Sequence, residues 1–307
     1  MKDTLPSHQI PRSGRPCILY QQTRIHRPSN RIDIAMVRRQ RKKKKQARRP
    51  GKASHGTDLV PPRPSSILLD PAAKQVIVFT DDILLNQLRR DGPHIERSFD
   101  HLCADDLVQL SSLHSKTSAL MFSGLRLAVA QDDDLRSACA QLLSNALNSF
   151  ASALALLRMG YVLQPGIIIR SILEAISTCL HLLQRPEDLP AYEAHTLQSP
   201  KTIATAKKVL PHFGSMYGHF SDSFAHIGKL HKAITPITEY VERDEALVAN
   251  LSALRMTNWL LYVTAELAFN ELVDSPRYWY PVDNGYRYDP SDDEKAWMTN
   301  FFQMDKD

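Results

Sequence analysis

Hydrophobic residues recur at helical spacing through most of the chain, most regularly between Asp244 and Val273. Small or apolar residues there follow a four-and-three spacing at Leu247, Leu251, Leu254, Asn258, Leu261, Ala265, Ala268 and Leu272. This spacing predicts a long helix with one packed stripe. Trp259 and Leu260 widen the apolar face beyond a two-stranded seam, so we expect the helix inside a bundle with its leucines at 247, 251, 254 and 261 buried.

Further helical patterns cover residues 81–90, 105–130, 134–159, 165–185, 187–195, 200–210 and 212–227. We expect Asp91-Gly92-Pro93 to break the first, Gly160 to cap the third and Pro165 to open the fourth. The one β-like run is Gln75–Thr80, which is either a short strand or an apolar lead-in to a helix. The sequence therefore predicts an all-α bundle of four to seven helices with at most one short strand.

Composition divides the chain into segments of different character. We expect a disordered basic tail over 1–60, a linker with a short helix over 61–100, the bundle over 101–275, and an aromatic and acidic tail packed on it over 276–307. Residues 1–60 have little apolar periodicity, so they cannot bury enough surface to offset the entropy of ordering.

Charge is divided unevenly between the first 60 residues and the rest of the chain. Residues 1–60 hold 16 Lys and Arg against 3 Asp and Glu, whereas the remaining 247 hold 22 against 30. The basic run consists of Arg38, Arg39, Arg41, Lys42, Lys43, Lys44, Lys45, Arg48 and Arg49. It has no aromatic residue for base stacking, so we expect residues 38–49 to bind nucleic acid through charge alone, without sequence specificity; a solvated tail with no partner is equally compatible. Met36 precedes the run, and a translation start there is a further alternative.

Cysteine usage and hydropathy bear on the compartment. Cys17, Cys103, Cys139 and Cys179 are scattered and form no CxxC pair, which suits a reducing compartment. The most apolar stretches, Ala151–Leu163 and Trp259–Phe269, are interrupted by charges and are too short to span a membrane. We therefore expect a cytoplasmic protein without a transmembrane segment.

A polar stripe marks the helix expected over 165–185. Arg170, Glu174, Ser177 and His181 lie four, three and four residues apart, so they share one face. The first two are placed to form an ion pair. The stripe is either the solvent-facing side of an amphipathic helix or one wall of a polar cleft.

A second polar group occupies residues 217–226, with Tyr217, Ser221 and Ser223 as candidate binding residues and His226 as a candidate catalytic one. The histidines at 212, 219 and 226 are two helical turns apart, about 10 Å, which is too far for two of them to bind one metal. We therefore predict no metal site, and no cofactor motif is present: the sequence has no GxGxxG, P-loop, GxSxG or HExxH.

Three short segments carry a resemblance: Leu156–Gly160, Ile169–Glu174 and Phe220–His226. Together they resemble a bacterial all-helical domain family of unknown function, over about residues 130–275. Its members have a helix ending in a small residue, an R-S-x-x-E helix and a later S-x(3)-H element. The resemblance implies a site at Arg170, Glu174 and His226 without naming its chemistry. Here Asp222 stands where the family has its serine, so the role of a serine is left open.

The bundle also distantly resembles the HEPN superfamily, whose ribonucleases place Arg and His four to six residues apart on one helix. The match in the body of the chain is Arg89-Arg90-Asp91-Gly92-Pro93-His94. Such spacings arise by chance in a sequence rich in Arg and His, so we do not interpret it as a catalytic signature.

Three functions stay open from the sequence. The first is a helical domain whose Arg170, Glu174 and His226 form a polar site for an anionic ligand. The second is a non-enzymatic interaction protein, including one that binds itself. The third is a HEPN-like ribonuclease or phage-defence effector. Convergence of Arg170, Glu174 and His226 in a cleft would favour the first or third, whereas separate exposed faces would favour the second.

Overall fold

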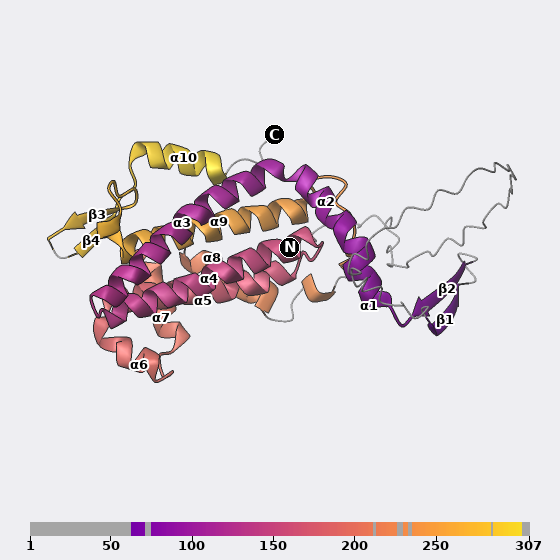
Figure 1. Cartoon of the computed structure of the whole chain (residues 1–307), viewed down its shortest axis with the longest axis horizontal. Helices are drawn as coiled ribbons and strands as arrows, with labels where there is room; N and C mark the ends of the chain where they lie inside the picture. The colour runs from indigo at the N-terminus through magenta and orange to yellow at the C-terminus, as the bar shows by residue number, and fades with distance from the viewer. Residues whose placement is uncertain are drawn as a thin grey trace, which may run out of the picture. The chain divides into compact units, whose positions relative to one another are not determined.

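The computed structural model describes residues 63–70, 75–210, 213–225, 230–232, 235–283 and 285–302. The described residues belong to two compact units that divide between Gln87 and Leu88 (Figure 1). The basic run at 38–49, the expected disorder of 1–60 and His226 lie outside the described residues, so those expectations stay predictions.

The unit before Leu88 contains a β-hairpin where we expected a linker. Strand β1 (Pro64–Asp70) pairs antiparallel with β2 (Gln75–Thr80), and α1 (Ile83–Asn86) follows. The expectation of at most one strand is therefore wrong. Residues 64–70 fall in the segment that we expected to be a linker, because strand pairing depends on a partner run, which no local window shows.

The second unit is a helical bundle. Its helices are α2 (Gly92–Leu102), α3 (Ala104–Ala130), α4 (Asp134–Arg158), α5 (Gln164–Gln184), α6 (Leu189–Glu193), α7 (Ser199–Val209), α8 (Phe213–Phe220), α9 (Glu245–Ala268) and α10 (Asp292–Phe302). Its 3-10 and π-helical turns are η1 (Gln87–Asp91), η2 (Pro186–Asp188), η3 (Ser221–Ala225), η4 (Leu230–Lys232) and η5 (Asn270–Leu272). The helical fold class is confirmed. The number of helices exceeds four to seven because α2 and α10 form in segments that we expected to be a linker and a tail.

Local signals explain most helix ends. The Asp133 carboxylate accepts the backbone N–H of Arg136 at 2.9 Å and caps α4. Gly160, at a φ of 85°, ends that helix in the left-handed region. The break expected at Asp91-Gly92-Pro93 coincides with a boundary between two elements: the turn η1 ends at Asp91, and α2 begins at Gly92. Pro93 lies in the first turn of α2, where proline is tolerated.

Helix α9 lies at the centre of the bundle, alongside α3, α4 and α5 (Figure 1). The leucines at 247, 251, 254 and 261 are each 0% exposed, as predicted. Helix α9 also buries polar side chains, and several of them bond to neighbouring elements. Asn258 donates to the carbonyl of Leu110 at 2.8 Å, and the fully buried Arg255 pairs with Asp106 of α3. These bonds offset the cost of burying polar groups in the core.

The segment after α9 packs on it through aromatic side chains and one carboxylate. Strand β3 (Trp279–Val282) pairs with β4 (Gly285–Tyr288), a second hairpin that the sequence did not lead us to expect. The Glu266 carboxylate of α9 accepts the backbone N–H groups of Arg277, Tyr278 and Trp279 through one oxygen, at 2.9, 2.7 and 3.1 Å. Tyr278, Trp279 and Phe301 are buried.

Helices α4 and α5 are long and apolar enough to cross a membrane by length and composition, which is weak evidence because core helices pass the same test. Both pack against α9 in the bundle. The most apolar windows thus fall in these helices rather than in Trp259–Phe269. The expectations of no membrane span and of a cytoplasmic location stay predictions.

Candidate functional site

The polar stripe of α5 faces α7 and α8 rather than water. Ser177 and His181 are 0% exposed, and Arg170 and Glu174 are each 31% exposed at their side chains. The interpretation of the stripe as a solvent-facing side is therefore wrong for Ser177 and His181. Because the other faces of α5 are apolar and packed, the helix is central, and its polar stripe requires partners on neighbouring helices.

Arg170, Glu174 and Tyr217 converge in one cluster. The first two lie one turn apart on α5, with Nη2 of Arg170 3.1 Å from Oε1 of Glu174. Tyr217 arrives from α8, 43 residues further along the chain than Glu174. Its hydroxyl accepts from Arg170 Nη2 at 3.2 Å and donates to Glu174 Oε1 at 3.0 Å. The three side chains form a closed triangle of one ion pair and two hydrogen bonds.

The triangle fixes the plane of the guanidinium. Its central carbon lies 5.6 Å from the centre of the Tyr217 ring, within cation–π range. Burial, and then the hydrogen bond to Glu174, raise the pKa of Tyr217, so its hydroxyl keeps its proton for donation. The hydrogen bond and the ion pair of Arg170 both use Nη2. Its Nε is buried without a hydrogen-bond partner in the described part of the chain.

The other predicted residues of the site lie on η3 or beyond it. Ser221 is half-buried at the start of this π-helical turn, and Ser223 follows on it. The Phe224 ring packs on Gly166, where an added Cβ would come within 2.3 Å of it. Gly166 is one helical turn before Arg170, so η3 docks beside the triangle. His226 lies outside the described residues.

The buried end of the stripe, at Ser177 and His181, belongs to a separate network that the sequence pattern did not predict. His181 Nε2 lies 2.8 Å from Asp188 Oδ2, and Nδ1 lies 2.7 Å from Thr205 Oγ1. Lys201 also donates to Asp188, at 2.7 Å. Lys201 and then His181 lower the pKa of the Asp188 carboxyl. Both ring nitrogens of a fully buried histidine are thus occupied, so this network joins helices and offers no base to a substrate.

The hydroxyls of Ser177 and Thr202, 3.0 Å apart, extend the same seam between α5 and α7. No single segment signals these pairings, because each partner lies on a different helix. The one local cue was the stripe itself, with polar residues on an otherwise apolar helix.

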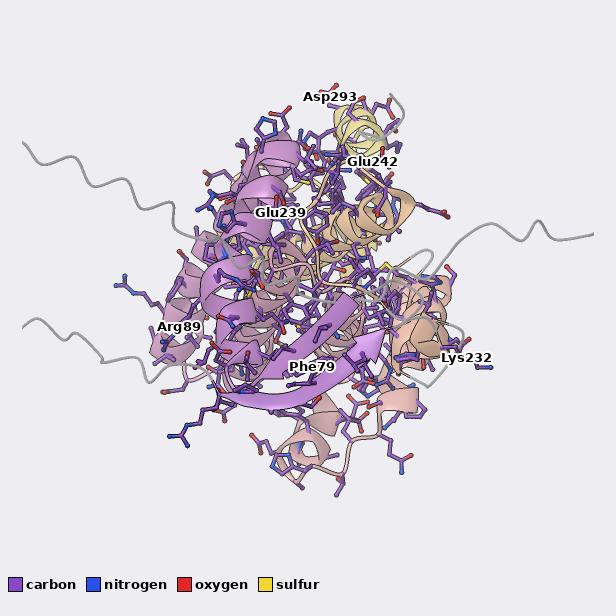
Figure 2. The ribbon with its side chains drawn as sticks, turned by 90° about the vertical axis from the view of Figure 1, so that its right-hand side faces the viewer. Phe79, Arg89, Lys232, Glu239, Glu242 and Asp293 are labelled. Atoms are coloured by element: carbon purple, nitrogen blue, oxygen red, sulfur yellow. The ribbon has the colours of Figure 1, made fainter. Side chains whose placement is uncertain are left out.

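The other residues that the sequence singled out lie outside the α5 stripe. Arg90 pairs with the adjacent Asp91 at 2.8 Å, and His94 lies on α2. Within the described ranges, no group of three His, Cys, Asp or Glu side chains is arranged to hold a metal ion. A cleft of about 280 Å³ beside the chain that enters α9 is lined by Glu239 and Glu242, labelled in Figure 2. It includes none of the predicted site residues.

No protein-family model matches the chain, and neither a curated protein nor a solved structure matches it. The resemblances to the bacterial helical family and to HEPN proteins therefore stay expectations. Functional inference has to come from the geometry of the described side chains.

Proposed function

We propose that the protein binds a small anion at Arg170. The observation that supports this proposal is the Arg170 guanidinium, which two partners hold in a fixed plane. It still has N–H groups that bond to neither partner. Arg170 is one-third exposed, so a ligand can reach it. Guanidinium donors bind carboxylates and phosphates in matching planar geometry.

Each neighbour has a distinct part in this proposal. Glu174 and Tyr217 orient the guanidinium through Nη2, which leaves Nη1 for the ligand, whereas Nε is buried. Ser221 supplies a hydroxyl donor from η3. We assign Ser223 and His226 to the same site from the sequence alone, with His226 as a charge that changes near neutral pH. The ion pair keeps Arg170 neutralised when the site is empty, which lowers the cost of holding a partly buried cation.

Calorimetric titration with sulfate tests the proposal, because sulfate keeps one charge state across the pH range of histidine titration. We expect saturable binding to the wild type. Arg170→Lys keeps the charge but loses the planar fork, and should weaken binding about tenfold, the equivalent of one charge-assisted hydrogen bond. Arg126→Lys changes an exposed arginine of α3 and is the matched control. Equal affinities of Arg170→Lys and wild type would contradict the proposal.

The pH dependence tests the role of His226. A protonated imidazole near the anion strengthens binding, so affinity should fall as pH rises through about 6.5, the ordinary histidine pKa. His226→Ala should remove this dependence while Tyr217→Phe keeps it. A wild-type affinity that is constant over this range would exclude His226 from the site.

Self-association is a second candidate function, favoured by the exposed apolar side chains of the unit before Leu88. Ile67, Leu69, Val76 and Leu84 are each more than 60% exposed. A two-stranded sheet is marginal by itself and has an open edge on each strand. The same edge of a second copy can pair with it about a two-fold axis, covering both apolar sets.

Sedimentation velocity distinguishes this second candidate. Leu69→Lys should shift a dimer toward monomer, whereas Val241→Lys, at an exposed valine of the bundle, should not. A wild-type chain that is monomeric at high concentration would contradict self-association and leave the anion proposal unaffected.

A further inference from the structure

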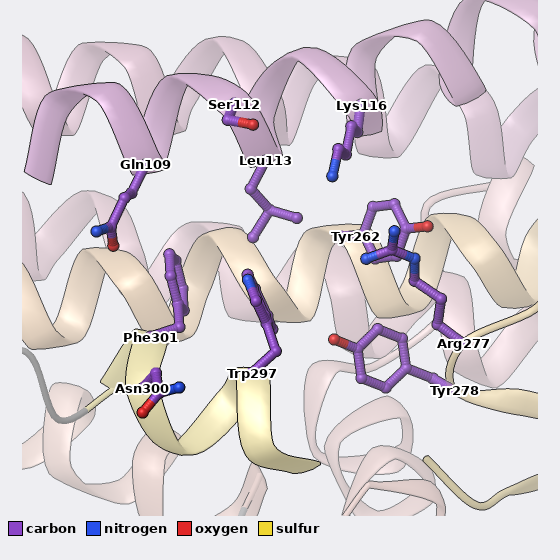
Figure 3. Close-up of a pocket in the computed structure, with 10 residues that line it drawn as sticks. All are labelled: Gln109, Ser112, Leu113, Lys116, Tyr262, Arg277, Tyr278, Trp297, Asn300 and Phe301. Carbon is purple, nitrogen blue, oxygen red and sulfur yellow. The ribbon is translucent and has the colours of Figure 1, made fainter. Parts of the chain in front are cut away.

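A cleft of about 330 Å³ lies between α3, α9 and α10 (Figure 3). None of the residues that line it belongs to the Arg170 cluster, so a ligand bound in this cleft would be independent of the anion proposed at Arg170. Its volume is at the lower end of the range for small-molecule pockets, which fits a ligand of one or two rings.

One side of the cleft is aromatic. Trp297 and Phe301 lie one turn apart on α10, with ring centres 4.7 Å apart and planes inclined by 14°. Phe301 is buried, whereas Trp297 is half-buried and reachable. Tyr278 is fixed by the hydrogen bond from its hydroxyl to Glu294, at 3.1 Å. These rings form a rigid apolar wall against which a flat ligand can stack.

The opposite end of the cleft is cationic. In Figure 3, Lys116 extends from α3 into the cleft, and the guanidinium of Arg277 lies in front of the Tyr262 ring. Arg277 is held by Glu294, with Nη1 3.1 Å from Oε1. Lys116 makes no hydrogen bond or ion pair with any residue in the described part of the chain. No carboxylate lines the cleft, so its lining is net positive.

We infer that this cleft binds a small planar aromatic anion. The acid group, a carboxylate or a phosphate, lies between Lys116 and Arg277, and the ring stacks on Trp297. An acid without an aromatic ring cannot stack on Trp297, and an uncharged aromatic molecule makes no charge contact with Lys116 or Arg277. Selectivity therefore requires both features in one molecule.

Calorimetric titrations with 2-naphthoate and 2-naphthyl phosphate test this inference and distinguish the two acid groups. Matched probes each lack one feature: 2-naphthalenemethanol has no charge, and cyclohexanecarboxylate has no aromatic ring. We expect at least one of the two aromatic acids to bind saturably, and both matched probes to bind about tenfold more weakly, a difference of about 1.4 kcal/mol.

Lys116→Gln should weaken binding of the preferred acid about fivefold to tenfold, because it removes one charge-assisted contact from an exposed position that does not affect folding. Arg126→Gln, on the same helix and outside the cleft, should bind as the wild type does. Trp297→Leu should abolish the preference for aromatic over cyclohexane acids. Binding of the aromatic acids no tighter than of the alcohol, or unchanged binding by Lys116→Gln, would overturn the inference.

Discussion

Replacement of Glu266 should release the C-terminal segment from the bundle. Its side chain is 0% exposed, and its Oε1 accepts three consecutive backbone N–H groups, from Arg277, Tyr278 and Trp279. Glu266→Leu puts an apolar side chain of similar size in its place and removes the acceptor. Two buried donors and one partly buried donor are then left without a partner.

The magnitude follows from the number of donors. Each orphaned buried N–H costs about 1–3 kcal/mol, so three cost roughly 3–9 kcal/mol if the segment stays in place. Burial raises the pKa of Glu266, so the wild type bears a desolvation cost that leucine removes. The net loss should therefore lie near 3 kcal/mol. If the segment detaches, water can bond to the three N–H groups, which limits the loss of stability. We therefore expect the helices of the bundle to stay folded.

The chain contains its own reporter for this release. Its three tryptophans are Trp259, which packs against Tyr278, and Trp279 and Trp297 of the segment itself. Tryptophan emission therefore reports on docking of the segment, whereas far-ultraviolet circular dichroism reports on the helices. We expect Glu266→Leu to shift emission to the red with little loss of helical signal, and its emission to change at lower urea than its ellipticity.

Two comparisons make the result decisive. Glu266→Gln keeps an oxygen acceptor for the three N–H groups, so its emission should stay close to that of the wild type. Glu271→Gln, at a half-exposed ion pair with Arg136, should cost less than about 1 kcal/mol. Wild-type emission and an unchanged urea midpoint in Glu266→Leu would refute the reasoning.

Three further predictions concern the core, the α5–α7 seam and the basic tail. Leu254→Ala should lower the free energy of unfolding by about 2–5 kcal/mol in urea titration, because Leu254 is fully buried; a loss below about 1 kcal/mol would count against its central position. Because the pKa of Asp188 is lowered in the folded protein, its carboxylate stabilises the fold above the ordinary carboxyl pKa of 3.8. This stabilisation is lost as the pH falls through the pKa of the folded protein. The stability difference between wild type and Asp188→Asn should therefore shrink in acid, and a difference constant from neutral to acid pH would contradict the assignment. Removal of residues 1–60 should leave the thermal midpoint unchanged and abolish weak, salt-sensitive nucleic-acid binding; unchanged binding would exclude the basic run as its source.

The helical core was predictable because its signals are local and periodic. The leucine spacing of α9, the cap at Asp133 and the left-handed Gly160 each act within a few residues. The two hairpins were missed for opposite reasons. The first required a partner strand for residues 64–70, which lies outside any local window. The second has a local cue in Asp283-Asn284-Gly285, a turn sequence between two runs with aromatic residues, but the aromatic and acidic composition of the segment favours a packed tail.

The candidate site was predictable only where its residues share a helix. The spacing of Arg170 and Glu174 predicts their ion pair, but Tyr217 reaches them only because short helices fold α8 back onto α5. The partners of His181 depend in the same way on how η2 and α7 pack. Side chains that meet across helices are fixed by tertiary packing, which periodicity does not encode.

The most direct test of anion binding observes Arg170 itself. In ¹⁵N-edited spectra of the arginine Nε–Hε groups, the Arg170 resonance is identified by its disappearance in Arg170→Lys. We predict that sulfate shifts this resonance saturably, with the Kd obtained by calorimetry, while the Arg126 resonance stays in place. An Arg170 resonance that does not move at sulfate concentrations that saturate the calorimetric signal would contradict an anion site at Arg170.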